Sequence, residues 1–168
     1  MTTRYGAVDV HYPDQGGARG ALVVAADPRF GTVVEERVAV VDAVPAYRPG
    51  FFFERELPAI RAALATTTAV DLLVVDGYVD LDPDGRPGLG AHVHAEIGEP
   101  VIGVAKTAFR SATHAVPVVR GSGRRPLYVT AVGIPVRDAA ALVSAMAGAH
   151  RIPDALRRVD RLARSVPG

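Results

Sequence analysis

Three acidic residues, far apart in the sequence, stand beside apolar stretches. Asp9 lies within the first apolar stretch, Glu56 precedes a Leu-Pro pair, and Asp76 follows the apolar run 72–75. A carboxylate is costly to bury unless a positive charge compensates it, and a divalent cation does this well. If the fold brings the three together, they form a cation site of the kind used by magnesium-dependent phosphodiesterases.

Each carboxylate also has an ordinary interpretation when it is taken alone. Asp9 fits an edge-strand residue that faces water. Glu56, near a predicted helix start, fits a residue that complements the helix dipole, an effect of about 0.3–1 kcal/mol. Asp76 followed by Gly77 is a common turn at a strand end. The metal interpretation therefore depends on all three meeting in the fold.

The composition is that of a globular protein. The chain has 168 residues, 49% hydrophobic and 22% charged, so we expect a single domain covering residues 1–168. No apolar run approaches the roughly 20 residues that cross a bilayer, and the start lacks the apolar segment of a signal peptide, so we expect no membrane partner. The chain has no cysteine, which excludes disulfides and thiolate metal sites and favours a cytoplasmic protein.

Positive charge is unevenly distributed along the chain. The net charge is only +1, so affinity for nucleic acid has to come from a local patch. Arginines gather in the Gly-rich stretch 120–125 and again in 151–164. We expect the second group to form the outer face of a helix. Arg124 and Arg125 are the better candidates for contacts with a phosphate backbone.

The first half of the sequence predicts a strand meander followed by a helix. Strands are expected at 5–12, 21–26 and 32–41, because Val-rich stretches are separated there by turns containing Pro, Asp and Gly. A loop at 42–53 leads to a helix at 55–65, in which Pro58 is tolerated if it lies in the first turn.

The second half alternates between helices and strands. Buried strands are predicted at 71–76, 101–105 and 127–134, and helices at 138–147 and 154–163. Between the first two of these strands, Leu89, Val93 and Ile97 form a helical stripe that ends at Gly98. The whole order predicts a mixed α/β layer with helices packed on it.

Taken in order, several segments resemble the endonuclease V family, the deoxyinosine-directed nucleases with a ribonuclease-H-like fold. The resemblance is carried by 8–12, by 46–51 with 55–58, by 71–77 with 88–92, by 100–107 and by the tail 149–160. It implies an α/β, ribonuclease-H-like mixed sheet, with an antiparallel three-strand meander followed by parallel strands and helices on both faces.

The resemblance also implies a catalytic centre. Asp9, Glu56 and Asp76 match the metal-binding carboxylates of the family. The implied cofactor is Mg²⁺, for which Mn²⁺ can substitute. Lys106 matches a lysine near the cut phosphate and would act there as a point charge.

Further residues match the family's contacts with nucleic acid. Tyr47-Arg48-Pro49-Gly50 corresponds to a rigid wedge inserted into the duplex, and Gly77 to the region that holds an extruded base. Arg124, Arg125 and His92 complete the predicted contacts, although His92, beside the helical stripe, fits helix packing equally well.

The sequence departs from the family pattern at several positions. The histidine of a Gly-His-Arg triplet after the last strand has no counterpart in 128–135. Ala46 and Arg48 replace a proline and an isoleucine of the wedge, Glu54 replaces a phenylalanine, and 82–84 reads Asp-Pro-Asp where the family has His-Pro-Arg.

Three functional hypotheses follow. The first is a Mg-dependent endonuclease that hydrolyses a phosphodiester bond near deaminated bases, such as inosine, in DNA or RNA, as part of DNA repair. The alternative, motivated by the departures, is a catalytically weakened or inactive nuclease-like protein that binds damaged or structured nucleic acid. The third keeps the metal site but acts on another substrate, such as RNA or a branched junction. The sequence leaves the oligomeric state open.

Overall fold

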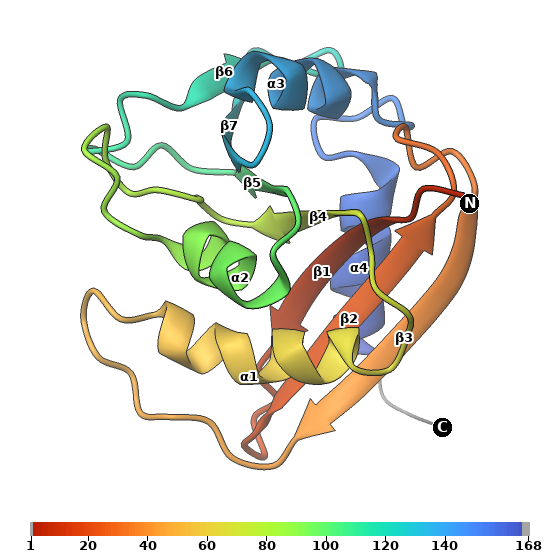
Figure 1. The fold of residues 1–168 in the computed structure, drawn as a ribbon, viewed down its shortest axis with the longest axis vertical. Helices are drawn as coiled ribbons and strands as arrows, with labels where there is room; N and C mark the ends of the chain where they lie inside the picture. Colours follow the sequence, from red (N-terminus) through yellow and green to blue (C-terminus); the bar gives the residue numbers. More distant parts are fainter. Residues whose placement is uncertain (1, 166–168) are drawn as a thin grey trace.

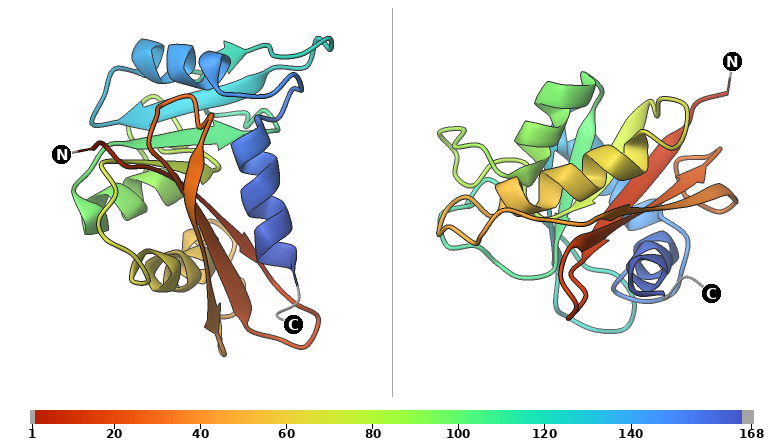
Figure 2. Two further views of the ribbon diagram at one scale, coloured as in Figure 1. Left: turned by 90° about the vertical axis from the view of Figure 1, so that its right-hand side faces the viewer. Right: turned by 90° about the horizontal axis from the view of Figure 1, so that it is seen from below.

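A seven-stranded sheet runs through the molecule and has helices against both faces (Figures 1 and 2). The computed structural model describes residues 2–165. In chain order the elements are β1 (Tyr5–His11), β2 (Ala18–Ala25), β3 (Val33–Val41), α1 (Phe53–Leu64), β4 (Leu72–Asp76), α2 (Leu89–Ile97), β5 (Val101–Ala105), β6 (Val116–Val118), β7 (Leu127–Val132), α3 (Val136–Ala145) and α4 (Asp154–Arg164).

The strand order is β3-β2-β1-β4-β5-β7-β6. As expected, β1, β2 and β3 form an antiparallel meander, and β4 and β5 run parallel to β1. The predicted fold class is confirmed with one refinement, because β7 runs antiparallel to β5, and β6 antiparallel to β7. Between residues 105 and 127 the chain forms no crossover helix, only the short strand β6, and a parallel return would need such a crossover.

Helices α1 and α2 cover one face of the sheet, and α3 and α4 cover the other (Figure 2). Side chains alternate between two core layers along the central strands. On β4, Leu72 and Val74 pack on the α3/α4 side, whereas Leu73 and Val75 pack on the α1/α2 side. This explains why β4 reads as a continuous apolar run, since both of its faces are covered.

The same alternation directs Asp9 and Asp76 to one side. Ala7 and Val74, two positions earlier on β1 and β4, belong to the α3/α4 core, so both aspartates point toward that face. The two strands are parallel neighbours up to the residues just before them. The aspartates therefore lie at the carboxyl ends of adjacent strands, where open α/β sheets place their ligands.

Glu56 approaches these strand ends from the opposite face, on α1. This helix begins at Phe53, two residues earlier than expected, so Pro58 falls in its second turn rather than its first. The helix lies very close to β2, because a Cβ at Gly20 would be only 2.2 Å from the carbonyl oxygen of Ala59. The missing side chain at Gly20 thus lets α1 bring Glu56, about one turn before Ala59, toward the strand ends.

No helix within residues 2–165 combines the length and apolar character needed to span a membrane.

Candidate active site

Asp9, Glu56 and Asp76 line one small pocket at the carboxyl ends of β1 and β4. We call it the carboxylate pocket; its lining is Val8, Asp9, Val10, Glu56, Ile60, Val75, Asp76 and Leu89. Asp9 and Asp76 also border a second small cavity, whose lining is completed by Lys106, by Val8 and Val104 on the strands, and by three apolar side chains near and on α4. The fold therefore brings the three carboxylates predicted from the sequence, together with Lys106, to one edge of the sheet.

Each carboxylate is already bonded to another group of the protein. Asp9 Oδ1 accepts a hydrogen bond from the N–H of Val10 at 2.9 Å, and Glu56 Oε2 accepts one from the Tyr12 hydroxyl at 3.0 Å. Lys106 Nζ lies 3.4 Å from Asp76 Oδ2. Within the described part of the chain, no three His, Asp or Glu side chains are arranged to hold a metal ion together. The three acids share a pocket without forming a closed ligand set.

Asp9 and Glu56 lack a fully compensating positive charge, whereas Asp76 is paired with Lys106. The pKa of Asp9 rises to about 7 because the group is buried and because Asp76 and Asp160 are close to it. The pKa of Glu56 also rises to about 7, through burial and the negative charges of Asp9 and Asp76, although the Tyr12 hydrogen bond opposes the shift. Carboxylate oxygens are the ligands that a hard divalent cation prefers. A bound cation would stabilise the charged forms of Asp9 and Glu56, which burial and the neighbouring acids disfavour.

Asp160 on α4 is a fourth acid of this site, and the sequence analysis did not select it. The carboxyl groups of Asp9 and Asp160 lie close enough to share a hydrogen bond, which raises the pKa of Asp9 and lowers that of Asp160. The pKa of Asp160 is lowered: burial raises it, but hydrogen bonds from Arg164 and Asp9 outweigh this effect. A sequence signal existed, because Asp160 falls one turn after the buried Leu156 and next to the buried Val159. A carboxylate so close to the buried face of an amphipathic helix predicts a hydrogen-bonding or charged group of the same protein next to it.

A larger apolar cavity of about 290 Å³ adjoins the carboxylate pocket, and Asp76 lines both. Its other lining residues come from the loop before α1 and the first residue of α1, the loop between β4 and α2, the start of α2 and the loop after β5: Gly50, Phe52, Phe53, Gly77, Tyr78, Leu81, Pro87, Gly88, Leu89 and Phe109. Gly77 has φ +137°, and nothing lies within 4 Å of where its Cβ would be. Its backbone is therefore open to a close approach by another molecule.

The predicted wedge residues lie in the loop between β3 and α1, beside this cavity. Tyr47 is 60% exposed, and Pro49 and Gly50 are also exposed. The guanidinium of Arg48 lies 4.2 Å from the ring centroid of Phe51 and 3.6 Å from a carboxylate oxygen of Glu54. The loop thus presents both an aromatic ring and a cation to solvent.

The remaining predicted contacts occupy two different positions. His92 on α2 stacks on Phe53 with ring centroids 3.6 Å apart, so it supports a wall of the apolar cavity. Arg124 and Arg125 are exposed in the loop before β7. Arg151 donates hydrogen bonds to the backbone carbonyls of both Arg125 and Lys106, which brings this basic loop close to the lysine at the carboxylate pocket.

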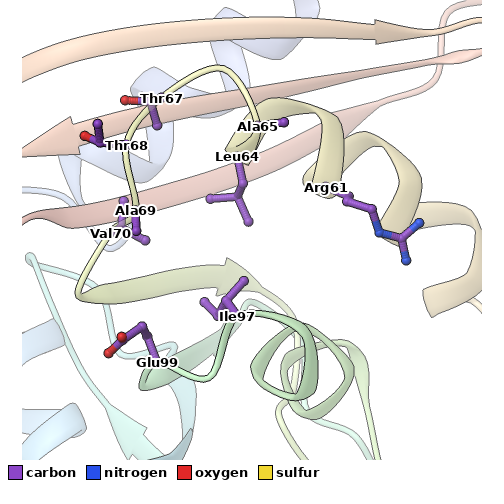
Figure 3. Close-up of a pocket in the computed structure, with 9 residues that line it drawn as sticks. All are labelled: Arg61, Leu64, Ala65, Thr67, Thr68, Ala69, Val70, Ile97 and Glu99. Atoms are coloured by element: carbon purple, nitrogen blue, oxygen red, sulfur yellow. The ribbon is translucent and has the colours of Figure 1, made fainter.

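Another cavity, of about 380 Å³, lies at the opposite edge of the sheet (Figure 3). It is formed by the end of α1, the segment before β4 and the end of α2, and is lined by Arg61, Leu64, Ala65, Thr67, Thr68, Ala69, Val70, Ile97 and Glu99. It contains a single carboxylate and lies at the amino ends of β4 and β5. This cavity therefore offers no group of acidic side chains that could share a cation.

Known proteins resemble this chain in both sequence and fold. The family model described as Endonuclease V matches residues 2–123. Endonuclease V of Streptomyces avermitilis is 34% identical over 97% of this chain and 80% of its own length. Endonuclease V of Thermococcus kodakarensis is 33% identical over 95% of this chain and 77% of its own length.

Solved structures have a similar fold. The crystal structure of the Streptomyces avermitilis protein has a TM-score of 0.79 at 32% identity, and covers 97% of this chain and 80% of that one. Endonuclease V of Ciona intestinalis, in complex with a 24mer DNA containing an inosine followed by a ribo-adenosine, shares the fold with a TM-score of 0.81 at 18% identity, covering 98% of this chain and 85% of that one. The extent of the family match and the identity of the relatives show that this chain belongs to the endonuclease V family of nucleases.

Proposed function

We propose that this protein hydrolyses a phosphodiester bond in DNA close to a deaminated base such as inosine, with Mg²⁺ as cofactor, as a step of DNA repair. The observation that carries the proposal is the position of Asp76, which lines both the carboxylate pocket and the adjoining apolar cavity. A single substrate strand could thus place a base in one and a phosphate at the other. The inosine-containing DNA bound by the Ciona relative supports this choice of substrate.

Asp9, Glu56 and Asp76 are the residues that would hold the cation. Their oxygen donors suit Mg²⁺, and the raised pKa values of Asp9 and Glu56 identify the charge that such an ion would compensate. When bound, Mg²⁺ stabilises negative charge that develops on a phosphoryl oxygen and lowers the pKa of water.

The other side chains of the site have distinct roles in the proposal. Lys106 Nζ, 3.4 Å from Asp76, attracts the phosphate and positions it beside the carboxylates. Tyr12 fixes the orientation of Glu56 through its hydrogen bond. Asp160, close to Asp9, adds negative charge beside the three carboxylates and would strengthen the attraction for a cation.

Recognition of the base belongs to the apolar cavity and its loops. Gly77 offers open backbone, and Phe52 and Phe53 offer ring surface on which a base can stack. The exposed loop containing Tyr47 and Arg48 would occupy the space that an extruded base leaves in the duplex. A deaminated base pairs poorly, so its extrusion costs less than that of a normal base, and this difference favours the damaged site.

The test is a nicking assay on an end-labelled duplex with one inosine, beside a matched duplex without it. We expect Mg²⁺-dependent nicking of the inosine strand and none in EDTA. Asp76→Ala should lower the single-turnover rate by about 10²-fold or more, as is typical when a group that stabilises the transition state is lost. Asp84→Ala is the matched control, because this exposed acid lies in the loop after β4 and outside both cavities.

Equal nicking by wild type and Asp76→Ala, or nicking of both duplexes alike, contradicts the proposal. Tight binding of the inosine duplex without nicking in either Mg²⁺ or Mn²⁺ identifies a nuclease-like binding protein instead. A parallel panel of RNA and branched substrates of equal length tests the substrate class.

A further inference from the structure

The side chain of Tyr78 joins two loops that border the apolar cavity. Its hydroxyl donates a 2.7 Å hydrogen bond to the carbonyl oxygen of Thr107 and accepts a 3.0 Å hydrogen bond from the N–H of Phe109. Both partners lie in the loop 106–115 that follows β5, where the chain has no regular secondary structure. The phenol thus supplies two backbone groups with the partners that a neighbouring strand would otherwise provide.

The loop that carries Tyr78 is itself firmly attached. The N–H of Val79 donates a 2.8 Å hydrogen bond to the buried hydroxyl of Thr130 on β7. The carbonyl of Tyr78 accepts a 3.1 Å hydrogen bond from the N–H of Gly90 on α2. Hydrogen bonds therefore hold the backbone at Tyr78 and Val79 to β7 and α2. Through its hydroxyl, Tyr78 in turn holds the irregular loop after β5 in place.

Phe109 needs such support, because packing holds it only in part. Its side chain is 41% exposed, and its ring centroid lies 5.9 Å from that of Tyr78 at an interplanar angle of 46°. Phe52, 48% exposed, lines the same cavity from the loop before α1. The loops that contain Phe52, Tyr78 and Phe109 all extend to the same side of the molecule, at the left in Figure 1.

We propose that Tyr78 is a positioning residue that sets Phe109 as a wall of the apolar cavity, and so controls how firmly the enzyme holds an extruded base. The identification of the occupant as a base rests on the proposed function. Aromatic side chains stack on the planar faces of bases, and a wall kept in place before binding costs less ordering when the base enters. Loss of the hydroxyl removes two loop contacts and lets Phe109 move.

The first test needs no substrate. The chain contains no tryptophan, so Phe109→Trp introduces a single indole whose fluorescence anisotropy reports the mobility of the cavity wall. Adding Tyr78→Phe should lower this anisotropy. Adding Tyr5→Phe instead should leave it unchanged, since Tyr5 packs against Phe30 at the start of β1. Equal anisotropy with and without the Tyr78 hydroxyl overturns the inference.

The second test asks whether the wall acts on the base. Single-turnover nicking is compared between the inosine duplex and an otherwise identical duplex with an abasic site. Tyr78→Phe should lower the inosine-to-abasic rate ratio by about three- to tenfold, the range expected for one or two lost hydrogen bonds. In a Phe109→Ala background the same substitution should change the ratio by less than about twofold, because the residue through which it acts is gone.

The outcomes separate this inference from the proposed function. An equal fall in rate on both duplexes, or an undiminished effect in the Phe109→Ala background, shows that Tyr78 does not act through the wall and overturns the inference. If wild type shows no preference for inosine, the proposed function fails and the occupant assigned here fails with it. The anisotropy result still decides whether Tyr78 positions Phe109.

Discussion

The hydroxyl of Tyr12 donates a 3.0 Å hydrogen bond to the carboxylate of Glu56, and this bond links the residue that follows β1 to α1. This bond lowers the pKa of Glu56, opposing the larger effect of burial that brings it to about 7. The guanidinium of Arg55 lies 4.7 Å from the centroid of the Tyr12 ring. Tyr12 therefore helps to keep a buried carboxylate ionised at the site where a cation is expected to bind.

Tyr12→Phe should move the acidic limb of the pH–rate profile to higher pH by about one unit, because a hydrogen bond to the charged form is lost and the pKa of Glu56 rises further. The measurement is the single-turnover nicking rate between pH 5.5 and 9. Tyr5→Phe is the control and should leave the limb in place. A Tyr12→Phe profile that is lower at every pH without a shift contradicts the assigned role.

The contribution of Asp9 and Glu56 to the unfolding free energy of the metal-free protein should fall as pH rises from about 4 to about 7. Asp9 and Glu56 have folded-state pKa values of about 7, against about 4 for unfolded carboxyl groups. At these two groups the folded state therefore binds more protons than the unfolded chain in this window, and the stabilisation that they contribute is lost as pH rises through the folded pKa.

Thermal midpoints measured between pH 4 and 8 test this linkage. In EDTA, Asp9→Asn should gain stability relative to wild type as pH rises, by about 2–4 °C for each kcal/mol of linkage removed. Millimolar Mg²⁺ should stabilise wild type more than the variant at pH 8. If the thermal midpoints of the two proteins differ by the same amount at every pH, the pKa of Asp9 is not raised in the folded protein.

Asp160→Ala should reduce Mg²⁺-dependent nicking by about 10²-fold or more, if Asp160 acts on the transition state as a fourth acid of the site. Asp138→Ala is the matched control, because Asp138 is exposed in the first turn of α3. Far-UV circular dichroism checks that both variants fold. An Asp160→Ala protein with wild-type rates would remove Asp160 from the site.

Arg120→Met should destabilise the protein by about 2–4 kcal/mol, through buried carbonyl groups that lose their donor. The Arg120 side chain is buried, and its guanidinium bonds the carbonyl oxygens of Val143, Ser144, Met146, Gly148 and His150. Urea unfolding measures the change, and the exposed neighbour Arg124→Met should change stability by less than about 0.5 kcal/mol. Similar losses for both variants would contradict this structural role.

Arg124→Gln combined with Arg125→Gln should weaken DNA binding equally for duplexes with and without inosine, because contacts with phosphate carry no base information. If each arginine neutralises one phosphate, the slope of log K against log salt should become shallower by about 1.8. Arg61→Gln, at the opposite edge of the sheet, should leave the slope unchanged. A loss limited to the inosine duplex would assign the two arginines to base recognition.

Local patterns in the sequence were sufficient for most of the architecture. The apolar run before Asp76 predicted a strand covered on both faces, which is how β4 lies in the sheet. The meander and the last two helices were also predicted, with their ends placed to within three residues. The direction of β7 was not predicted, since a short apolar run records burial but not which neighbour it pairs with or in which direction.

The sequence by itself identified Asp9, Glu56 and Asp76 as candidate metal ligands, because each borders apolar residues. The family resemblance then assigned the three to one metal site. Only the tertiary structure decided what surrounds them. Asp160 reaches Asp9, and Tyr78 holds the loop of Phe109, through contacts between segments that are distant in the sequence. Residue type and periodicity report burial along one element, whereas the pKa of an acid and the position of a wall depend on the groups that other elements bring within a few ångströms.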